Sequence, residues 1–169
     1  HDTRLNRSVA VKFLSLEFTD ETARRRFQQE AKMASALNHP HIVTVHEAGE
    51  ADGRPYLVTE YVDGGTLTQW AEAEKRSWKQ IVDLLIGVAD GLAAAHSAGI
   101  LHRDIKTANI LVAKNGYAKL ADFGLAKLAE QPAAAGAGDA TRLIEEQTRP
   151  GVVVGTIAYM APEQAQGKP

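Results

Sequence analysis

The chain has 169 residues, 44% of them hydrophobic and 24% charged, a composition close to that of ordinary globular domains. A formal net charge of −2 gives neither a basic field for nucleic acid nor a polybasic stripe for a membrane. The absence of cysteine excludes disulfides, thiolate metal sites and a cysteine nucleophile.

The two ends of the sequence predict an internal piece of a longer protein. His1–Arg7 has no initiator methionine and leads directly into an apolar run. Gly167–Pro169 follows the last motif with no further helix. The sequence has no apolar run of the roughly 18 residues that a membrane span requires, and it has no signal-peptide pattern.

A strand and a helix are predicted first. Val9–Leu14 is a short apolar run typical of strands, with Lys12 inside it. Residues 19–22 supply a capping hydroxyl and first-turn acids, and the apolar positions that follow share one helical face: Ala23, Phe27, Ala34 and Leu37. Glu30 lies on that face, where a carboxylate requires a cationic partner. We expect the partner to be Lys12, although separately the two residues also fit an edge lysine and a solvated helix position.

A turn and a hairpin come next. Pro40 ends the helix, and the neighbouring His39 and His41 are interpreted as turn residues because no further metal-ligand cluster is near them. Two strands are predicted beyond this turn, Ile42–Glu47 and Tyr56–Val62.

The turn between these strands is Asp52-Gly53, a strong hairpin signal. Asp63–Gly65 then interrupts the pattern and is the candidate hinge between two lobes. Helices are predicted over 66–74 and 78–98, with Gly99 at the C-terminal cap. The second helix carries a broad apolar face expected to form core: Trp78, Ile81, Val82, Leu85, Val88, Leu92 and Ala95.

A polar stretch follows this helix, held between two apolar pairs, Ile100-Leu101 and Leu111-Val112. Asp104, Lys106 and Asn109 are spaced by two and then three residues, so they do not share one face of a strand. We therefore expect a loop with converging polar groups. An acid, an amine and a carboxamide close together can accept a proton, neutralise an anion and bind a metal, which is a catalytic set.

A second hairpin is predicted at Asn115-Gly116. It returns Asp122 to the neighbourhood of Asn109. A carboxylate and a carboxamide from adjacent strand ends make an oxygen-rich site of the kind that Mg²⁺ prefers.

Residues 131–147 differ in character, because their alanine and glycine runs offer nothing to pack. Thr141, Thr148 and Thr156 lie in or after this low-complexity segment. Order is expected to resume at 155–163.

Five segments resemble, in the correct order and across nearly the whole chain, the signature motifs of the eukaryotic-type (Hanks-type) serine/threonine protein kinases. They are the lysine strand Val9–Lys12, the helix residue Glu30, the catalytic loop His102–Asn109, the metal-binding motif Asp122–Gly124 and the segment end Ala161–Glu163.

Two details resemble the serine/threonine branch rather than tyrosine kinases: Lys106 two residues after Asp104, and Gly155-Thr156 ahead of the segment end. The ending Ala161–Ala165 is similar to that of bacterial members.

The resemblance implies an α+β, two-lobed protein-kinase-like fold that is partial. Residues 1–62 correspond to the N-lobe without the strands of its Gly-rich loop, and 63–169 to the C-lobe without its C-terminal helices. An exposed apolar surface and a loss of activity in the isolated piece are then expected.

The implied activity is transfer of the ATP γ-phosphate to protein serine or threonine hydroxyls, with Mg²⁺ or alternatively Mn²⁺. The implied ATP-binding residues are Ala10 and Leu111 on either side of adenine, Thr59 as gatekeeper, the backbone of Glu60 and Val62, and Lys12 at the phosphates. The metal ligands would be Asn109 and Asp122.

The implied catalytic roles belong to four side chains. Asp104 accepts or orients the substrate hydroxyl proton, and Lys106 neutralises charge on the transferring group. Glu30 holds Lys12. Thr156 is expected to hydrogen-bond within the catalytic loop and to favour a hydroxyl substrate.

Regulation is predicted from Arg103, which lies next to the base and faces a threonine-bearing segment. A phosphothreonine there, Thr148 first and Thr141 second, would pair with it and order the segment. Both threonines also fit ordinary polar loop positions. A homodimer for autophosphorylation in trans, a cytoplasmic location and a membrane-anchored parent chain are further expectations.

One departure and two alternatives accompany this interpretation. Thr107 stands where the family usually has proline, with a small expected effect. A pseudokinase or ATP-binding scaffold is the first alternative, although such proteins usually lose Lys12, Asp104 or Asp122. A small-molecule phosphotransferase is the second, although that group typically lacks the long segment and its Ala-Pro-Glu end.

Overall fold

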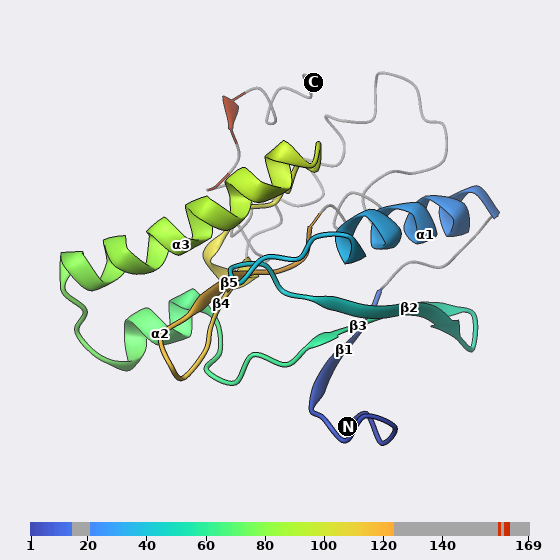
Figure 1. Cartoon of the computed structure of the whole chain (residues 1–169), viewed down its shortest axis with the longest axis horizontal. Helices are drawn as coiled ribbons and strands as arrows, with labels where there is room; N and C mark the ends of the chain where they lie inside the picture. The colour runs from blue at the N-terminus through green and yellow to red at the C-terminus, as the bar shows by residue number, and fades with distance from the viewer. Residues whose placement is uncertain (15–20, 124–158, 160, 163–169) are drawn as a thin grey trace, which may run out of the picture. The chain divides into compact units, whose positions relative to one another are not determined.

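Two antiparallel sheets and three α-helices make up the part of the chain that the computed structural model describes, namely residues 1–14, 21–123, 159, 161 and 162 (Figure 1). The described residues up to 123 belong to one unit, whose architecture follows, and the other three belong to a second unit. The first unit is α+β, as predicted. None of the described helices is long and apolar enough to span a membrane.

The larger sheet has the strand order β1-β3-β2, from β1 (Val9–Phe13), β2 (Val45–Ala51) and β3 (Arg54–Glu60). The predicted hairpin is confirmed, since Asp52 and Gly53 both have positive φ, 51° and 74°, as a type I′ turn requires. The predicted strand from Ile42 begins too early. The backbone at Ile42 and Val43 pairs with Leu120 instead, so β2 starts at Val45.

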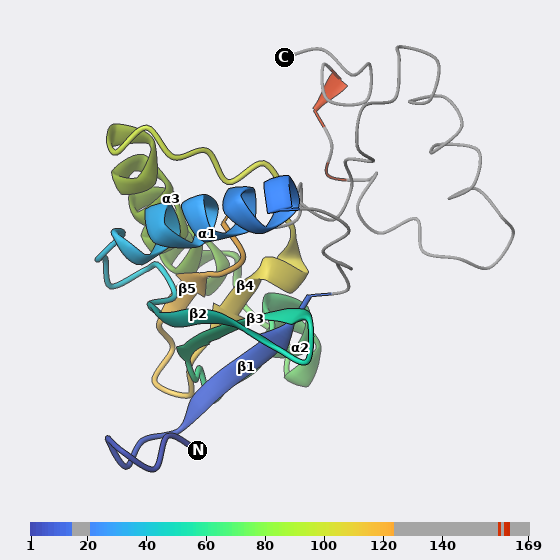
Figure 2. The same ribbon diagram turned by 90° about the vertical axis from the view of Figure 1, so that its right-hand side faces the viewer.

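Helix α1 (Glu21–Ser35) lies along one face of this sheet (Figure 2). The predicted apolar face is confirmed at Phe27, Ala34 and Leu37, all buried, while the side chain of Ala23 and the cap at 19–20 lie outside the described residues. Phe27 packs with Leu14, Ala31 and Leu57 in a small core between helix and sheet.

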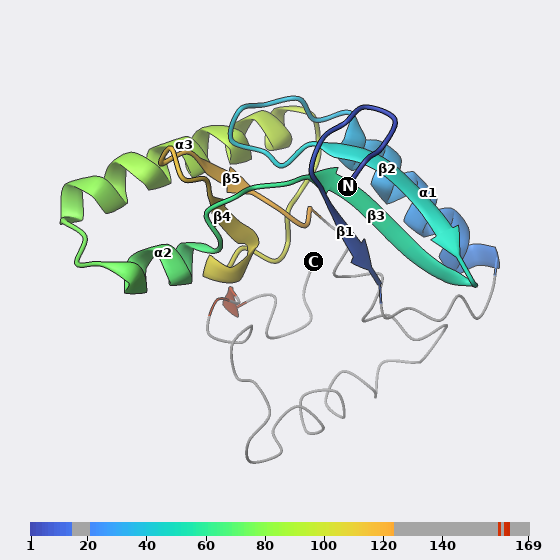
Figure 3. The same ribbon diagram turned by 90° about the horizontal axis from the view of Figure 1, so that it is seen from below.

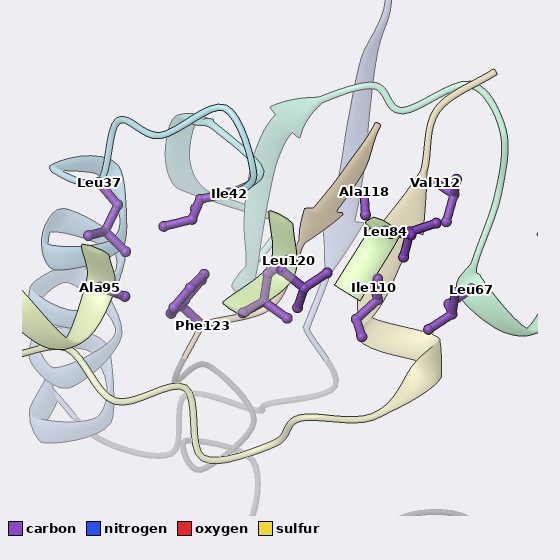
Figure 4. Close-up of a cluster of buried hydrophobic side chains, with 11 residues drawn as sticks. Leu37, Ile42, Leu67, Leu84, Ala95, Ile110, Val112, Ala118, Leu120 and Phe123 are labelled. Atoms are coloured by element: carbon purple, nitrogen blue, oxygen red, sulfur yellow. The ribbon is translucent and has the colours of Figure 1, made fainter. Parts of the chain in front are cut away.

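The second half contains α2 (Leu67–Ala73), α3 (Trp78–Ser97), the 3₁₀ turn η1 (Thr107–Asn109) and the hairpin of β4 (Ile110–Val112) with β5 (Ala118–Leu120). Both α-helices begin with a capping box, Thr66 with Gln69 and Ser77 with Gln80, which satisfies amides that the helix leaves unpaired. The main core lies where α3, the hairpin and α2 meet (Figure 4).

The hairpin lies beside the larger sheet (Figure 3), and Leu120 of β5 is hydrogen-bonded to the loop that leads into β2. Its N–H donates to the His41 carbonyl at 2.8 Å, and its own carbonyl accepts from Val43 N–H at 2.9 Å. His41 also contacts the Ala118 carbonyl through Nδ1 at 2.7 Å and stacks on Tyr117. The loop after α1 is therefore fixed to β5.

The predicted core face of α3 is partly wrong. Leu84, Val88, Gly91 and Ala95 are buried, whereas Trp78 is 77% exposed and Val82 44% exposed. Ile81 and Leu85 are exposed as well. The helix is apolar on two adjoining faces, and among the described residues the packing is on the face that meets β5 and the His41 loop. The periodicity identified the helix but not which face would be packed.

Candidate functional site

The polar loop brings its three predicted side chains together. The Asp104 carboxylate Oδ2 lies 2.7 Å from Lys106 Nζ and accepts a hydrogen bond from Asn109 Nδ2 at 2.9 Å. Asn109 Nδ2 also donates to the Asp104 carbonyl at 2.8 Å. The side chains of Asp104 and Lys106 are only 14% and 24% exposed, so water screens this cluster weakly.

The ends of the loop explain why the backbone delivers this geometry. Gly99 has φ +74° and ends α3, and Ile100 N–H then donates to the Ala95 carbonyl at 2.9 Å. Arg103 and Asp122 have positive φ of 66° and 63°, which is uncommon for residues other than glycine. Backbone strain of this kind concentrates at functional sites.

His102 joins the loop to the segment that carries Asp122. It is buried, its ring nitrogen Nε2 lies 2.8 Å from the Ala121 carbonyl, and Asp104 N–H donates to Nδ1 at 3.3 Å. These partners assign the proton to Nε2, because a carbonyl only accepts. Burial lowers the pKa of His102, partly offset by the hydrogen bond to Ala121 and by nearby carboxylates, so the ring is held neutral. Its ring also packs on Phe123, with 4.7 Å between centroids.

Lys12 pairs with Asp122 rather than with Glu30. Its Nζ lies 2.7 Å from Asp122 Oδ2. Glu30 keeps a buried carboxylate oxygen, Oε2, without a hydrogen-bond partner. Burial raises the pKa of Glu30, while the charges of Arg103 and Arg26 lower it by smaller amounts. The predicted Lys12–Glu30 ion pair is therefore not formed in this structure, where Lys12 is paired with Asp122, another residue that lines the cavity.

A cavity of about 180 Å³ lies between the larger sheet and the hairpin. Of the predicted ATP-binding residues, Ala10, Lys12, Thr59 and Leu111 line it, whereas Glu60 and Val62 do not. The other lining residues, which the sequence did not single out for this cavity, are Ala34, Val43, Val45, Leu57, Ala108, Ala121 and Phe123, together with Asp122. The volume lies below the roughly 300 Å³ at which ligand pockets usually begin.

Glu60 has a further role that the sequence did not reveal. Its side chain accepts hydrogen bonds from Thr44 N–H at 2.8 Å and from Lys119 Nζ at 2.9 Å. This links the end of β3 to β5. The sequence contains both a glutamate and a lysine in predicted strands, but the two are 59 residues apart and only the fold shows that they meet.

The oxygen donors at the loop fit a magnesium ion. Asn109 uses its amide nitrogen for Asp104, which leaves Oδ1 free of those two bonds, and Asp122 supplies a carboxylate. Mg²⁺ is commonly held by one or two such ligands, with water and phosphate completing its shell. Within the described part of the chain there is no group of three or more histidine, cysteine or acidic side chains placed to hold a metal.

The predicted regulatory residues are only partly described. Arg103 is exposed and acts electrostatically on Glu30. Thr141, Thr148 and Thr156 lie outside the described residues, as does Glu163.

A larger cavity, of about 980 Å³, lies between α2, α3 and the turn of the β4–β5 hairpin. None of the predicted site residues lines it. The charged cluster and the smaller cavity are therefore the better candidate site, because the chemistry resides there.

Comparison with known proteins gives curated relatives of similar sequence. The chain is 40% identical over 174 residues to a probable serine/threonine-protein kinase, SCO3848, of Streptomyces coelicolor, covering 99% of this chain and 24% of the relative. It is 39% identical over 172 residues to serine/threonine-protein kinase PknB of Mycobacterium tuberculosis, covering 98% of this chain and 26% of PknB. The chain therefore spans about a quarter of the length of these relatives.

Solved structures agree with the sequence relatives. A double mutant of the PknI kinase domain of Mycobacterium tuberculosis superposes with a TM-score of 0.67 at 32% identity, covering 95% of this chain and 56% of that one. A single mutant of the same domain gives a TM-score of 0.61 at 38% identity, over 74% and 51% of the two chains. The family model described as the protein kinase domain matches residues 1–169. Since that match takes in every residue, the chain belongs to the protein kinase domain family.

Proposed function

We propose that this chain is the catalytic part of a serine/threonine protein kinase, which transfers the γ-phosphate of ATP to hydroxyl groups of protein substrates. The observation that carries the proposal is the cluster of Asp104, Lys106 and Asn109, with His102 joining it to the Asp122 segment. The names of the curated relatives support the same reaction.

Asp104 has the contacts that its role requires. It accepts or orients the proton of the substrate hydroxyl, and Lys106 neutralises charge on the transferring phosphoryl group. Their separation of 2.7 Å keeps both groups at one point before substrate arrives. Phosphoryl transfer needs little covalent help, so this positioning and charge stabilisation supply most of the rate.

Nucleotide and metal binding follow from the cavity and the oxygen donors. Adenine lies between Ala10 and Leu111 with Thr59 behind it, and the backbone of Glu60 and Val62 provides its hydrogen bonds. Bound Mg²⁺, held by Asn109 and Asp122, neutralises the phosphate charge. Lys12 then leaves Asp122 for the phosphates, and Glu30 becomes its partner.

We place the boundary between the two lobes at Val62 and Asp63, where β3 has ended and α2 has not begun. Residues 1–62 form the N-lobe part and 63–169 the C-lobe part.

Regulation runs through Arg103. A phosphate on Thr148, or secondarily on Thr141, pairs with this arginine and draws it from the neighbourhood of Glu30. Thr156 hydrogen-bonds within the catalytic loop. Autophosphorylation in trans would use a homodimer, and the kinase part would work in the cytoplasm, attached to a membrane-anchored parent chain.

The test is phosphoryl transfer by the full-length protein. Incorporation of γ-phosphate into a generic protein such as casein, without transfer to aminoglycosides or choline, is the expected result. Asp104→Asn should abolish transfer while nucleotide binding survives. Nucleotide binding by the wild-type protein without any transfer would indicate a pseudokinase and would overturn the proposal.

A further inference from the structure

The backbone between Lys106 and Thr107 has a geometry suited to proline. Lys106 is extended, with φ −154° and ψ 161°, and Thr107 is the first residue of the 3₁₀ turn η1. An extended residue is what proline imposes on its predecessor, and the first helical position is where proline is favoured. Threonine has no ring to fix its φ. The turn between Lys106 and Asn109 is therefore held without a proline ring, in part by the hydrogen bond from Asn109 N–H to the Lys106 carbonyl at 2.9 Å.

Thr68 supplies a further restraint from a different element. Its Oγ1 donates a hydrogen bond to Thr107 Oγ1 at 2.9 Å, and the two residues are 39 apart in sequence. Because Thr68 lies on α2, the bond joins that helix to the turn inside the catalytic loop.

Helix α2 is well placed to serve as the fixed side of this contact. Its first turn is closed by the capping box of Thr66 and Gln69, and Leu67 is buried in the main core. Just before it, the Gly65 carbonyl accepts from Val112 N–H at 2.8 Å. The start of α2 is thus anchored to β4 and to the core independently of Thr68.

We propose that Thr68 is a positioning residue for phosphoryl transfer, which acts through the hydroxyl of Thr107. Thr107 follows Lys106 directly and precedes Asn109 by two residues. These two side chains contact Asp104 at 2.7 and 2.9 Å. The hydroxyl pair adds a side-chain restraint from α2 to the backbone hydrogen bonds that already close this turn, Asn109 N–H to the Lys106 carbonyl at 2.9 Å and Ile110 N–H to the Thr107 carbonyl. This inference rests on the proposed kinase function.

Four variants of the full-length protein test the proposal. Thr68→Val removes the hydroxyl and keeps the shape, while Thr68→Ser keeps the hydroxyl. The double variant Thr68→Val with Thr107→Pro replaces the hydrogen bond by a fixed φ. Thr22→Val is the matched control, because Thr22 is an exposed threonine on α1.

Two measurements are made on each variant: kcat and KM for ATP with casein as substrate, and hydrogen exchange of the backbone amides of residues 101–112. Thr68→Val should lower kcat by about three- to tenfold, since one hydroxyl hydrogen bond is lost near the reacting groups, and should leave KM for ATP unchanged. Exchange in the loop should be faster. Thr68→Ser should resemble the wild type, and Thr107→Pro should restore both kcat and exchange to the Thr68→Val protein.

A kcat and a loop exchange in Thr68→Val equal to those of Thr22→Val would overturn the proposal. A loss of kcat that Thr107→Pro does not restore, with loop exchange unchanged, would overturn it too, since the loss would then arise elsewhere. If the wild-type protein shows no transfer, the proposed function fails, and the exchange measurement alone still decides whether Thr68 orders the loop.

Discussion

Lys12 Nζ lies 2.7 Å from Asp122 Oδ2, so the predicted phosphate-binding lysine and the predicted metal ligand neutralise one another. Their side chains are 52% and 27% exposed, and exposed ion pairs of this kind contribute little to stability. We therefore expect Lys12 and Asp122 to matter mainly for nucleotide and metal binding, after the ion pair between them has separated.

Asp122→Asn should therefore change stability and activity by very different amounts. We expect the free energy of unfolding to fall by less than about 1 kcal/mol, because the pair is solvent-screened. Phosphoryl transfer should fall by about 100-fold or more, since the proposed magnesium site would lose its carboxylate. Urea unfolding and steady-state kinetics on the same preparations measure both. A large loss of stability with nearly intact transfer would contradict the assigned role.

Glu30→Gln should remove a buried charge that has no hydrogen bond at Oε2. Burial raises the pKa of Glu30, so the unfolded chain releases this proton at lower pH than the folded one. Ionisation of Glu30 therefore costs stability as pH rises from the unfolded pKa through the folded pKa, and the cost persists above it.

At pH 7 Glu30→Gln should accordingly be at least as stable as the wild type, and its advantage should vanish near pH 4. Its transfer activity should nevertheless fall, because glutamine cannot hold Lys12 by charge. Denaturation midpoints at pH 4, 5.5 and 7 test the first statement, with Gln29→Ala on the exposed side of α1 as control. A variant that is less stable than the wild type at pH 7 would contradict it.

His102 should make the fold sensitive to mild acid. Burial lowers its pKa, so below the unfolded pKa of about 6.5 the unfolded state binds a proton that the folded state does not. The stabilising contribution of the neutral His102 ring is thus fully present above the unfolded pKa, and it is lost as pH falls toward the folded pKa. His102→Gln should lose stability at pH 7.5, because the ring contact with Phe123 is removed, yet should show a weaker decline between pH 7.5 and 5.5. An unchanged pH slope would show that His102 is not the group responsible.

Gly87 and Gly91 on α3 allow the His41 loop to pack closely against the helix. We expect substitution by alanine to cost different amounts of stability at these two positions. A Cβ at Gly91 would meet the backbone carbonyl oxygen of His41 at 2.9 Å, whereas the atoms nearest to one at Gly87 belong to the His41 ring, the first at 2.3 Å. The ring is held by side-chain contacts, its Nδ1 bond to the Ala118 carbonyl and its stacking on Tyr117, whereas the backbone is held by the bond to Leu120.

We expect Gly91→Ala to lower stability by about 1–3 kcal/mol through overpacking. Gly87→Ala should cost less, because a side-chain ring can shift at the expense of its own contacts whereas the bonded backbone cannot, while the helix-propensity gain of about 1 kcal/mol is common to both variants. Thermal unfolding of both variants gives the order, and the reverse order would refute the proposed anchoring.

The sequence predicted most local structure because local signals were strong. The Asp52-Gly53 turn, the loop of Asp104 and Asn109, and the buried stripe of α1 all depend on residues close together in the chain. The sequence could not predict which face of α3 is buried, because the helix has two apolar faces that differ only in what packs against them. The partner of Lys12 was not predictable either, because Glu30 and Asp122 are both carboxylates and tertiary distance alone selects between them.

The hydrogen bonds between the His41 loop and β5 hold the chain in place just beyond the C-terminal end of α1, so that a tilt of the helix would move its more distant residues most. Helix α1 ends at Ser35, and the loop that follows it is fixed at the backbone of His41 and Val43. Glu30 lies about 7.5 Å from Ser35 along the axis, at the rise of an α-helix. A tilt of about 15° about that end of the helix would move Glu30 by roughly 2 Å, following from the same helical dimensions. A small rotation of this helix would therefore change the distance from Glu30 to Arg103, whose charge lowers the pKa of Glu30, while the backbone bonds to β5 stay in place.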